Sequence, residues 1–481
     1  MDQKTRIEHV EQGGAKAHVV TDATGAPVQV DYSGSHEKTS PEEIRLVRKL
    51  DRWIMPTLWI MFWLNYLDRN AIALARLNTL EEDLELKGSE YQTCVSILFV
   101  GYLLGQIPSN MFLTRTRPSL YLAICMTLWA IVSALTAVSK NFVGLLLTRF
   151  FLGLTEAPYY PGALYLLSIF YTRKEIATRI SILYTGNILA TAFAGLIAAG
   201  IFSGMDGLGG LEGWRWLFIL QGAVTFVVAI GAIFTLPDDP LATRWLTPEE
   251  RKLAQDRIDQ DTVGRSDSSS SLKGLKEAAS DYRVWIFAFM QHMHLAANGF
   301  KNFFPTVVKT LGFNTTITLV LTCPPYLVAG AISVAWSVSS GKYNERTWHI
   351  TVAKSIAIAG FVLGCATLNV GARYFATFVF CTGTYAVNSI ILGWVGSTCG
   401  QTKEKKASAL SIVNTIANVS FIWTPYLWSP SDEPRYGTAM GSSAAFSLVT
   451  AVLAWVMKII LMRENKKIRA SNDETVLRYV Y

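Results

Sequence analysis

The chain has 481 residues, of which 51% are hydrophobic and only 16% are charged, and its mean hydropathy is +0.29. This composition excludes an ordinary soluble enzyme and is typical of a polytopic membrane protein. The net charge of +7 comes mainly from basic residues in short loops between apolar segments. It therefore indicates membrane topology and argues against a nucleic-acid partner.

The first half of the chain begins with a polar stretch, residues 1–50, whose Gly and Ser content predicts a disordered tail. Apolar segments follow, each long enough to cross a bilayer core, which needs roughly 20 residues. They lie near residues 53–74, 91–113, 120–138, 142–170, 180–202 and 214–236. We therefore expect a bundle of six membrane spans over residues 51–236.

A long polar segment, residues 237–281, separates this group from a second one. It contains Thr247-Pro248-Glu249-Glu250, a pattern typical of a helix start, and so predicts a linker with one short amphipathic helix. Six more apolar segments lie near residues 284–304, 315–340, 348–368, 373–395, 407–428 and 438–461. The sequence thus predicts an all-α polytopic membrane protein with twelve transmembrane helices in two six-helix bundles, the second over 282–465, followed by a tail at 466–481.

Basic residues mark one side of the membrane. If the span count is even, they fall in loops on a common side, whereas the opposite loops are poor in Lys and Arg and the first of them is acidic. By the positive-inside rule, both termini and the central linker are expected in the cytoplasm of a multi-pass plasma-membrane protein. The basic loop residues include Arg45, Arg48, Arg117, Arg173, Lys174, Lys342, Lys405 and Arg463.

Two full charges, Arg149 and Glu156, lie inside the fourth apolar segment. Seven residues is nearly two helical turns, so the two share one face about 10 Å apart, with Gly153 and Tyr160 on the same stripe. Each charge costs roughly 2.5–3.5 kcal/mol at mid-bilayer, so its expected role is in a transport pathway or proton relay. The alternative is a buried pair that is only structural.

The first segment adds Asp68 and Arg69, which point about 100° apart on a helix and can face different neighbours, one span four and the other a central cavity. We find no Asp or Glu within the last six segments, so any coupling protons are expected to be moved by the N-terminal half. An Asp68–Arg149 or Glu156–Arg69 bridge that only fixes helix packing is the alternative.

The seventh segment carries a polar stripe. Gln291, His294, Asn298 and Lys301 are spaced to share one helix face and would suit an anionic or zwitterionic substrate. Polar contacts that only hold helices together are the alternative. Lys354, about one turn into the ninth segment, is expected to reach the cytoplasmic surface and has no assigned role.

Four motifs carry a family resemblance: Asn65-Tyr66-Leu67-Asp68-Arg69 and the runs 149–162, 213–222 and 430–436. With them, the chain resembles the anion:cation symporter family of the major facilitator superfamily, and within it the fungal allantoate and nicotinate permease group. The resemblance implies the major facilitator fold, with two pseudo-symmetric bundles that rock about a central site. It also implies uptake of a small organic anion driven by protons.

By the same resemblance, Asp68 and Glu156 match acids that take part in proton coupling, and Arg69 matches an arginine that holds a substrate carboxylate. We add Arg149, Tyr160 and the span-seven stripe as expected substrate contacts. The candidate substrates are a vitamin carboxylate, a ureido acid, or a sulfur-containing amino acid or sulfonate.

Two other functions stay open: an exporter of a fungal metabolite, and a nutrient sensor that does not transport. No nucleophile–base pair, phosphate loop or metal cluster is visible, so we expect no enzyme activity, no metal and no cofactor other than the coupling protons. The expected partners are the small anionic substrate and the lipid bilayer, and a monomer is expected.

Overall fold

The computed structural model describes residues 40–113, 116–261, 271–343, 345–399 and 403–470, together with 20–21, 27–28 and 479. The regular elements in these ranges are helices, apart from the short antiparallel pair β1 (Val20–Thr21) and β2 (Pro27–Val28). Most of the tail expected over residues 1–50 lies outside the described residues.

The N-terminal bundle contains six spans, and the fourth is a helix broken in two. The spans are α1 (Pro41–Ala75), α3 (Glu90–Leu113), α4 (Pro118–Thr136), α5 (Phe142–Glu156) with α6 (Tyr159–Phe170), α7 (Arg173–Met205) and α8 (Gly213–Thr235). The short helices α2 (Leu80–Asp83) and η1 (Leu208–Gly210) lie in its loops.

The C-terminal bundle also has six spans, four of which are interrupted. They are α11 (Tyr282–Ala297) with η2 (Asn298–Asn302) and α12 (Phe304–Lys309), α13 (Thr315–Leu321) with α14 (Cys323–Tyr343), α15 (Thr347–Ala366), α16 (Val370–Tyr385) with α17 (Asn388–Thr398), α18 (Lys403–Asn418) with α19 (Ser420–Trp423) and η3 (Thr424–Leu427), and α20 (Gly437–Ala470). A short turn, η4 (Pro430–Asp432), precedes α20.

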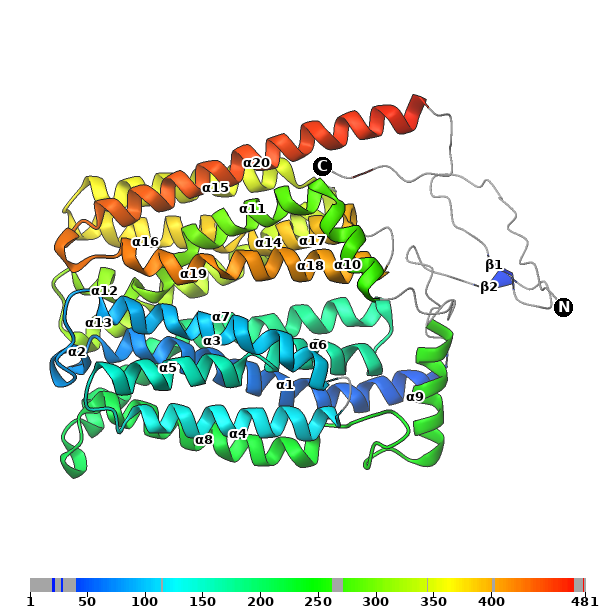
Figure 1. Cartoon of the computed structure of the whole chain (residues 1–481), viewed down its shortest axis with the longest axis horizontal. Helices are drawn as coiled ribbons and strands as arrows, with labels where there is room; N and C mark the ends of the chain where they lie inside the picture. Colours follow the sequence, from blue (N-terminus) through cyan, green and yellow to red (C-terminus); the bar gives the residue numbers. More distant parts are fainter. Residues whose placement is uncertain are drawn as a thin grey trace.

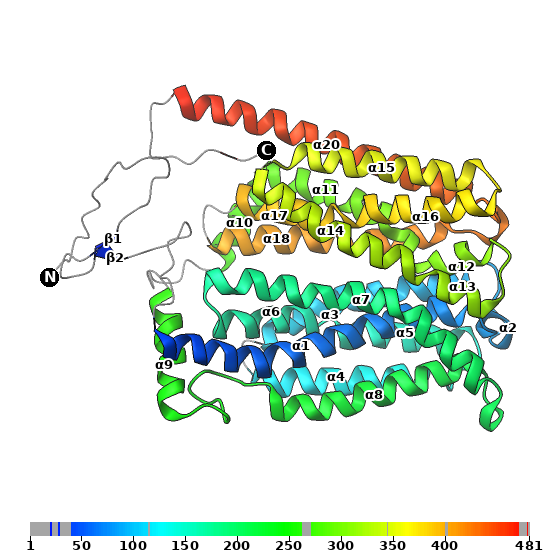
Figure 2. The same cartoon turned by 180° about the vertical axis from the view of Figure 1, so that it is seen from behind.

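The two bundles lie side by side with their helices roughly parallel to one long axis (Figures 1 and 2). In the described part of the chain, eight helices are long and apolar enough to cross a membrane. With α1, α3 and the broken helices α5–α6 and α11–α12, they make up the twelve spans, so the fold expected from the sequence is confirmed.

The segment between the bundles forms two helices, α9 (Pro248–Asp261) and α10 (Ser271–Ser280), where the sequence predicted one. Helix α9 packs on the N-terminal bundle and α10 on the C-terminal bundle. Both lie at one end of the molecule, which we call the linker end; α2 and α12 lie at the opposite, far end (Figure 1).

Helix α1 begins ten residues before the end of the expected tail, which corrects that boundary. Ser40 accepts a hydrogen bond from the Glu42 amide, Pro41 occupies the first turn, and two glutamates there favour the helix dipole. The added turns bury Leu46, and they are held to α9 by a salt bridge of 2.7 Å between Lys49 and Glu250. The expected tail at 466–481 likewise begins as helix, because α20 runs to residue 470.

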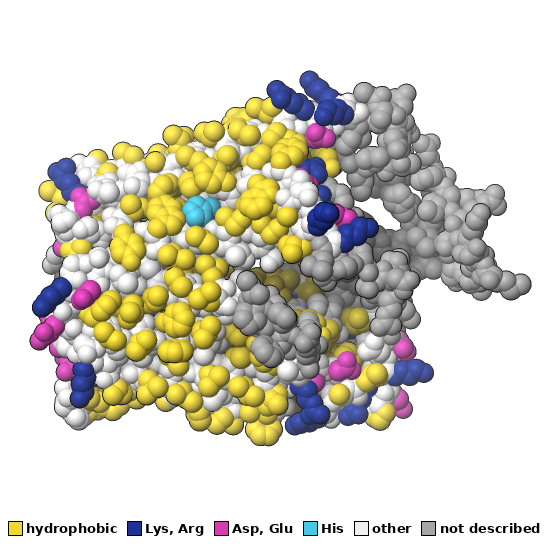
Figure 3. All heavy atoms as spheres, viewed as in Figure 1, with side chains coloured by type: hydrophobic (Ala, Val, Ile, Leu, Met, Phe, Trp, Pro, Cys, Tyr) yellow, Lys and Arg dark blue, Asp and Glu magenta, His cyan; other side chains and the backbone are white. Residues whose placement is uncertain are grey.

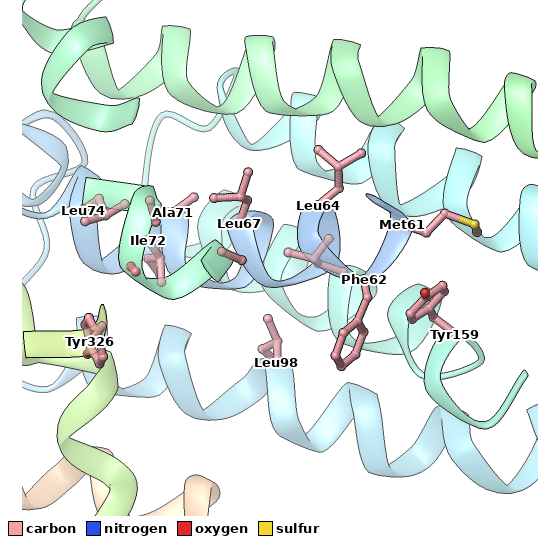
Figure 4. Close-up of a cluster of buried hydrophobic side chains, with 14 of the residues drawn as sticks. Met61, Phe62, Leu64, Leu67, Ala71, Ile72, Leu74, Leu98, Tyr159 and Tyr326 are labelled. Atoms are coloured by element: carbon pink, nitrogen blue, oxygen red, sulfur yellow. The ribbon is translucent and has the colours of Figure 1, made fainter. Parts of the chain in front are cut away.

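Hydrophobic packing around α1 forms the centre of the N-terminal bundle. Side chains along α1, from Met61 to Leu74, lie beside Leu98 of α3, Tyr159 of α6 and Tyr326 of α14 (Figure 4). Helices α3 and α5 approach so closely that a Cβ atom added to Gly153 would lie 1.9 Å from the Leu98 carbonyl oxygen. This contact fixes α5, and with it the charges of span four, against the core.

Contacts between the bundles close the far end. Gln92 of α3 donates a hydrogen bond to the Trp428 carbonyl (3.1 Å), and Thr315 of α13 donates one to the Leu77 carbonyl (3.4 Å). Aromatic rings also meet across the same boundary, among them Tyr91 with Phe303 and Phe99 with Phe421. In contrast, the surface is hollowed between the bundles toward the linker end (Figure 3).

Candidate functional site

The centre of the N-terminal bundle holds an ion pair between Arg69 of α1 and Glu156 at the end of α5. The Arg69 Nε and Glu156 Oε2 atoms are 2.5 Å apart. The glutamate side chain is fully buried, whereas 15% of the arginine side chain is exposed. One of the two bridges that the sequence left open, Glu156–Arg69, is therefore present.

A helix break places Glu156 in this position. Helix α5 ends at Glu156 and α6 starts at Tyr159, with Pro158 between them, which lacks an amide hydrogen and cannot continue the backbone ladder. Beyond the break, the Tyr159 hydroxyl donates a hydrogen bond of 2.5 Å to the Leu58 carbonyl of α1. The break is thus tied to the helix that carries Arg69.

Asp68 makes its hydrogen bonds with other helices of the N-terminal bundle and not with this pair. It is completely buried and accepts hydrogen bonds from Ser133 of α4 (3.1 Å) and Thr225 of α8 (3.5 Å). The two neighbours on α1 thus face different elements, as their angular offset requires. Arg69 faces span four, while Asp68 faces spans three and six.

Arg149 lies behind the ion pair and is only 2% exposed. Its Nη2 atom is 3.5 Å from the Arg69 carbonyl oxygen, and its Nε and Nη1 atoms have no hydrogen-bond partner among the described residues. Arg149 therefore presents its charge to the backbone of α1 from within the bundle and makes no salt bridge with Asp68.

Aromatic rings surround the exposed side of Arg69. The guanidinium carbon lies 4.5 Å from the ring centre of Tyr102 on α3 and 5.4 Å from that of Tyr66 on α1. Such contacts stabilise a cation while leaving its N–H groups free to donate. Tyr160, one of the expected substrate contacts, stacks on Phe62 nearby, with ring centres 5.7 Å apart.

Lys301 of η2 supplies a cation from the other bundle. Its ammonium lies 4.2 Å from the ring centre of Phe421, and no acidic side chain among the described residues pairs with it. It is close enough to Arg69 for the two positive charges to interact. Arg69 and Lys301 thus bring two cations from different bundles to this part of the boundary, and of these two Arg69 has a counter-ion.

A chain of hydrogen bonds crosses the same boundary. Gln291 of α11 donates to Asn388 of α17 (2.7 Å), and Asn388 donates to the hydroxyl of Tyr184 on α7 (3.1 Å). The chain links two spans of the C-terminal bundle to one of the N-terminal bundle.

The expected polar stripe of span seven is divided. Helix α11 ends at Ala297 and continues as the 3₁₀ turn η2, so Lys301 no longer continues the line of Gln291 and His294. His294 is completely buried, and Asn298 is 8% exposed. Lys354 is also completely buried, so the prediction that it reaches the membrane surface is wrong.

Comparisons with known proteins decide the family. The model of the Major Facilitator Superfamily matches residues 58–425. The chain belongs to the major facilitator superfamily. It is 30% identical to the MFS-type transporter cnsO of Penicillium expansum, over 92% of this chain and 86% of that protein.

Solved structures of other major facilitator proteins share the fold. One is a bacterial homolog of the human lysosomal transporter Spinster in an inward-facing and occupied conformation, with a TM-score of 0.67, 16% identity, and coverage of 86% of this chain and 97% of that one. Another is a D-xylose-proton symporter, with a TM-score of 0.64, 15% identity, and coverage of 84% and 96%. The family match and the similarity to an MFS-type transporter show that this major facilitator chain is a multi-pass membrane transporter.

Some residues at the boundary of this major facilitator chain were missed from the sequence. Three of them are tyrosines in apolar spans, Tyr66, Tyr102 and Tyr184. Aromatic residues are common in such spans, so nothing in the sequence indicated that these three belong to the site. Asn388 offered a signal, because it is an amide inside an apolar span. It starts α17 directly after the break that follows α16.

Proposed function

We propose that this transporter takes up a small organic anion together with protons by alternating access, as a monomer in the plasma membrane. The substrate class is a vitamin carboxylate, a ureido acid, or a sulfur-containing amino acid or sulfonate. It is the class carried by the anion:cation symporter family and its allantoate and nicotinate permease group. The observation that carries the proposal is the pair of cations at the bundle boundary, where Arg69 is neutralised by Glu156 and Lys301 has no acidic partner among the described residues.

An anion bound between Arg69 and Lys301 would accept hydrogen bonds from one cation of each bundle. Charge-assisted hydrogen bonds to a carboxylate or sulfonate are stronger than neutral ones, and the Arg69 fork is suited to a planar anion. The rings of Tyr66, Tyr102 and Phe421 offer apolar contact to the rest of a small molecule. Because the two cations belong to different bundles, occupancy favours states in which the bundles are close.

Proton coupling would arise because the Glu156 carboxylate and the substrate anion compete for Arg69. The Glu156 carboxylate and an anionic substrate are alternative partners of one guanidinium. Protonation of Glu156 removes its charge and leaves Arg69 free for the substrate, so acid on the substrate side favours binding. Loss of the proton on the other side restores the ion pair and favours release. Asp68, held by two hydroxyl groups in the same bundle, is the second proposed proton carrier.

The charge distribution supports a cytoplasmic linker end. Basic side chains such as Lys49, Arg179 and Lys405 gather there, whereas the far end carries the acidic residues Glu81 and Glu85. By the positive-inside rule this orientation exposes the hollow between the bundles to the cytoplasm. Uptake of two protons with one monovalent anion would also draw on the membrane potential, roughly 2.3 kcal/mol per charge per 100 mV.

The test is uptake of a labelled panel into permease-deficient yeast at acidic pH: nicotinate, pantothenate, allantoate, cysteine, a sulfonate and sulfate. It compares wild type with Glu156→Gln, with and without a protonophore. We expect one anion to accumulate, accumulation to collapse with the protonophore, and Glu156→Gln to lose accumulation. The matched control is Glu212→Gln, which removes a loop glutamate paired with Arg215 and is expected to keep uptake.

Uptake that ignores the protonophore, or an unimpaired Glu156→Gln, would contradict proton coupling. Net outward flux of the identified anion from preloaded cells under an inward proton gradient would favour an exporter. Binding of an anion without flux in either direction would favour a sensor.

A further inference from the structure

The interior of the C-terminal bundle holds two ionisable side chains that the proposed mechanism does not use together. Lys354 of α15 and His294 of α11 are both completely buried. The Lys354 Nζ atom and both His294 ring nitrogens have no hydrogen-bond partner among the described residues. Lys354 is close enough to act electrostatically on His294.

Their setting matches that of Asp68 in the other bundle. Asp68 lies on the first span of its bundle and faces the third and sixth spans through Ser133 and Thr225. His294 lies on the first span of the C-terminal bundle, and its ionisable neighbour, Lys354, is on the third. Helix α20, the sixth span, packs against both of their helices.

The register of α20 against α15 is defined by two close approaches. Trp348 of α15 packs on Trp455, with ring centres 5.0 Å apart, and a Cβ atom on Gly364 would lie 3.9 Å from the Met440 sulfur. Interpolation between these two antiparallel contacts sets Lys354 opposite the turn of α20 that contains Thr450, a buried residue whose hydroxyl donates to the Phe446 carbonyl.

Acidic side chains are missing around this lysine. Among the described residues, the charged side chains of α16 and α20, the elements packed on α15, lie toward helix ends: Arg373 near the start of α16, and Lys458, Arg463, Glu464, Lys466 and Lys467 toward the end of α20. Lys458 pairs with Glu345, which precedes α15, whereas Lys354 lies two turns into α15 and acts electrostatically on His294. An ammonium buried without a counter-ion is costly, which favours a neutral amine in this state. A neutral Lys354 amine can accept a proton. Because a proton takes up almost no space, the closely packed interior of the bundle can bind it without a cavity.

We propose that Lys354 and His294 form a proton-binding centre in the C-terminal bundle, so that coupling protons are not confined to the N-terminal half. Protonation of the amine would place an uncompensated charge in the bundle. That charge favours conformations in which water or the substrate anion comes near. The role in coupling rests on the proposed function, whereas proton binding itself can be measured without any substrate.

The experiment uses full-length protein in proteoliposomes on a solid-supported membrane. A step from neutral to mildly acidic buffer, with no substrate present, moves a charge that reports proton binding. We expect Lys354→Met to reduce this charge to roughly two-thirds of the wild-type value, because one of three proposed proton-binding groups is lost while Glu156 and Asp68 remain. The control, Lys458→Met, removes a lysine of the same bundle that is paired with Glu345 and is expected to keep the full charge.

Thermal unfolding of the same proteins separates proton binding from a structural role. Lys354→Met should melt no lower than wild type, because it replaces a buried amine without partners by an apolar side chain of similar length. A lower melting temperature, or failure to fold, would make the amine a structural group and overturn the proposal. Full wild-type charge in Lys354→Met, or complete loss of charge in Glu156→Gln, would overturn it too.

The outcome is independent of the uptake assay. A charge that depends on Lys354 in a protein without proton-driven uptake would keep the proton-binding centre and reject only the proposed function.

Discussion

The two bundles share an architecture but treat ionisable groups differently. In the N-terminal bundle, Glu156 pairs with Arg69 and Asp68 is held by two hydroxyl groups. In the C-terminal bundle the acids of the spans lie only near helix ends, Glu404 at the start of α18 and Glu464 near the end of α20. Two cations of this bundle, Lys301 and Lys354, have no acidic partner among the described residues.

This difference suggests that the two bundles respond differently to a proton and to an anion. A neutralised pair can exchange one partner for another, because protonation of the acid releases the arginine. A cation without a counter-ion instead gains most when an anion arrives, since its desolvation is then compensated. An anion between the bundles would therefore supply the missing counter-ion of Lys301 on the C-terminal side. On the N-terminal side it would compete with Glu156 for Arg69.

The largest expected effect comes from moving the helix that carries Glu156. In Gly153→Leu, the new side chain would collide with the backbone of α3, because even a Cβ atom would lie 1.9 Å from the Leu98 carbonyl oxygen. Two rigid helices cannot both give way, so we expect most of the folded protein to be lost. Size-exclusion chromatography of the detergent-extracted protein measures this.

Its control is Gly231→Leu on α8, an exposed helical glycine with no atom within 4 Å of an added Cβ. We expect this variant to elute like wild type. A normal yield of folded Gly153→Leu would show that α3 and α5 do not need their close contact.

A smaller effect is expected at the cation of the other bundle. Lys301→Met keeps the length of the side chain and its contact with the Phe421 ring but removes the charge. Loss of one charge-assisted hydrogen bond to the substrate should raise KM by about 10-fold to 100-fold, with less change in maximal rate. Concentration-dependent uptake of the anion identified from the panel measures both.

Lys309→Met is the matched control, because this lysine is exposed on the neighbouring helix α12. Its KM should stay at the wild-type value. A similar KM in Lys301→Met would remove Lys301 from the substrate site and leave binding to the N-terminal bundle alone.

The sequence predicted the spans well because a bilayer requires long apolar segments, and length is visible in the chain. Broken helices did not hide spans four and seven, since their apolar character continues across Pro158 and Gly299. The same reasoning set the first helix ten residues late, because the amphipathic turns from Pro41 pack on α9, an element whose position the sequence does not reveal.

The sequence predicted which residue types form the site, but not which neighbouring helices their side chains face. The spacing of Asp68 and Arg69 fixed the angle between them but not the rotation of α1, which depends on its neighbours. The stripe of span seven assumed one continuous α-helix, and η2 changed the phase before Lys301. Lys354 was misplaced because a position near a span end does not show whether the side chain faces lipid or the bundle core.

The smallest expected effect concerns how the linker is fastened to the C-terminal bundle. Asp281 caps α11 and accepts hydrogen bonds from Arg283 (2.8 Å) and Lys405 (2.7 Å). Burial alone would raise the pKa of Asp281, but these hydrogen bonds stabilise the carboxylate and lower its pKa to about 2. Asp281→Asn keeps a cap but loses the charge, so we expect a melting temperature a few degrees lower at neutral pH.

The stabilisation by the Asp281 carboxylate should depend on pH. The folded pKa lies below the ordinary value of about 4, so the stabilisation is present above that value and disappears as pH falls toward about 2. The difference in melting temperature between wild type and Asp281→Asn should thus be constant near neutrality and shrink in acid. Asp256→Asn, at an exposed position of α9, should show no difference at either pH. Equal melting of Asp281→Asn and wild type at neutral pH would mean that α10 is held to the C-terminal bundle by packing alone, without a contribution from the ion pairs of Asp281.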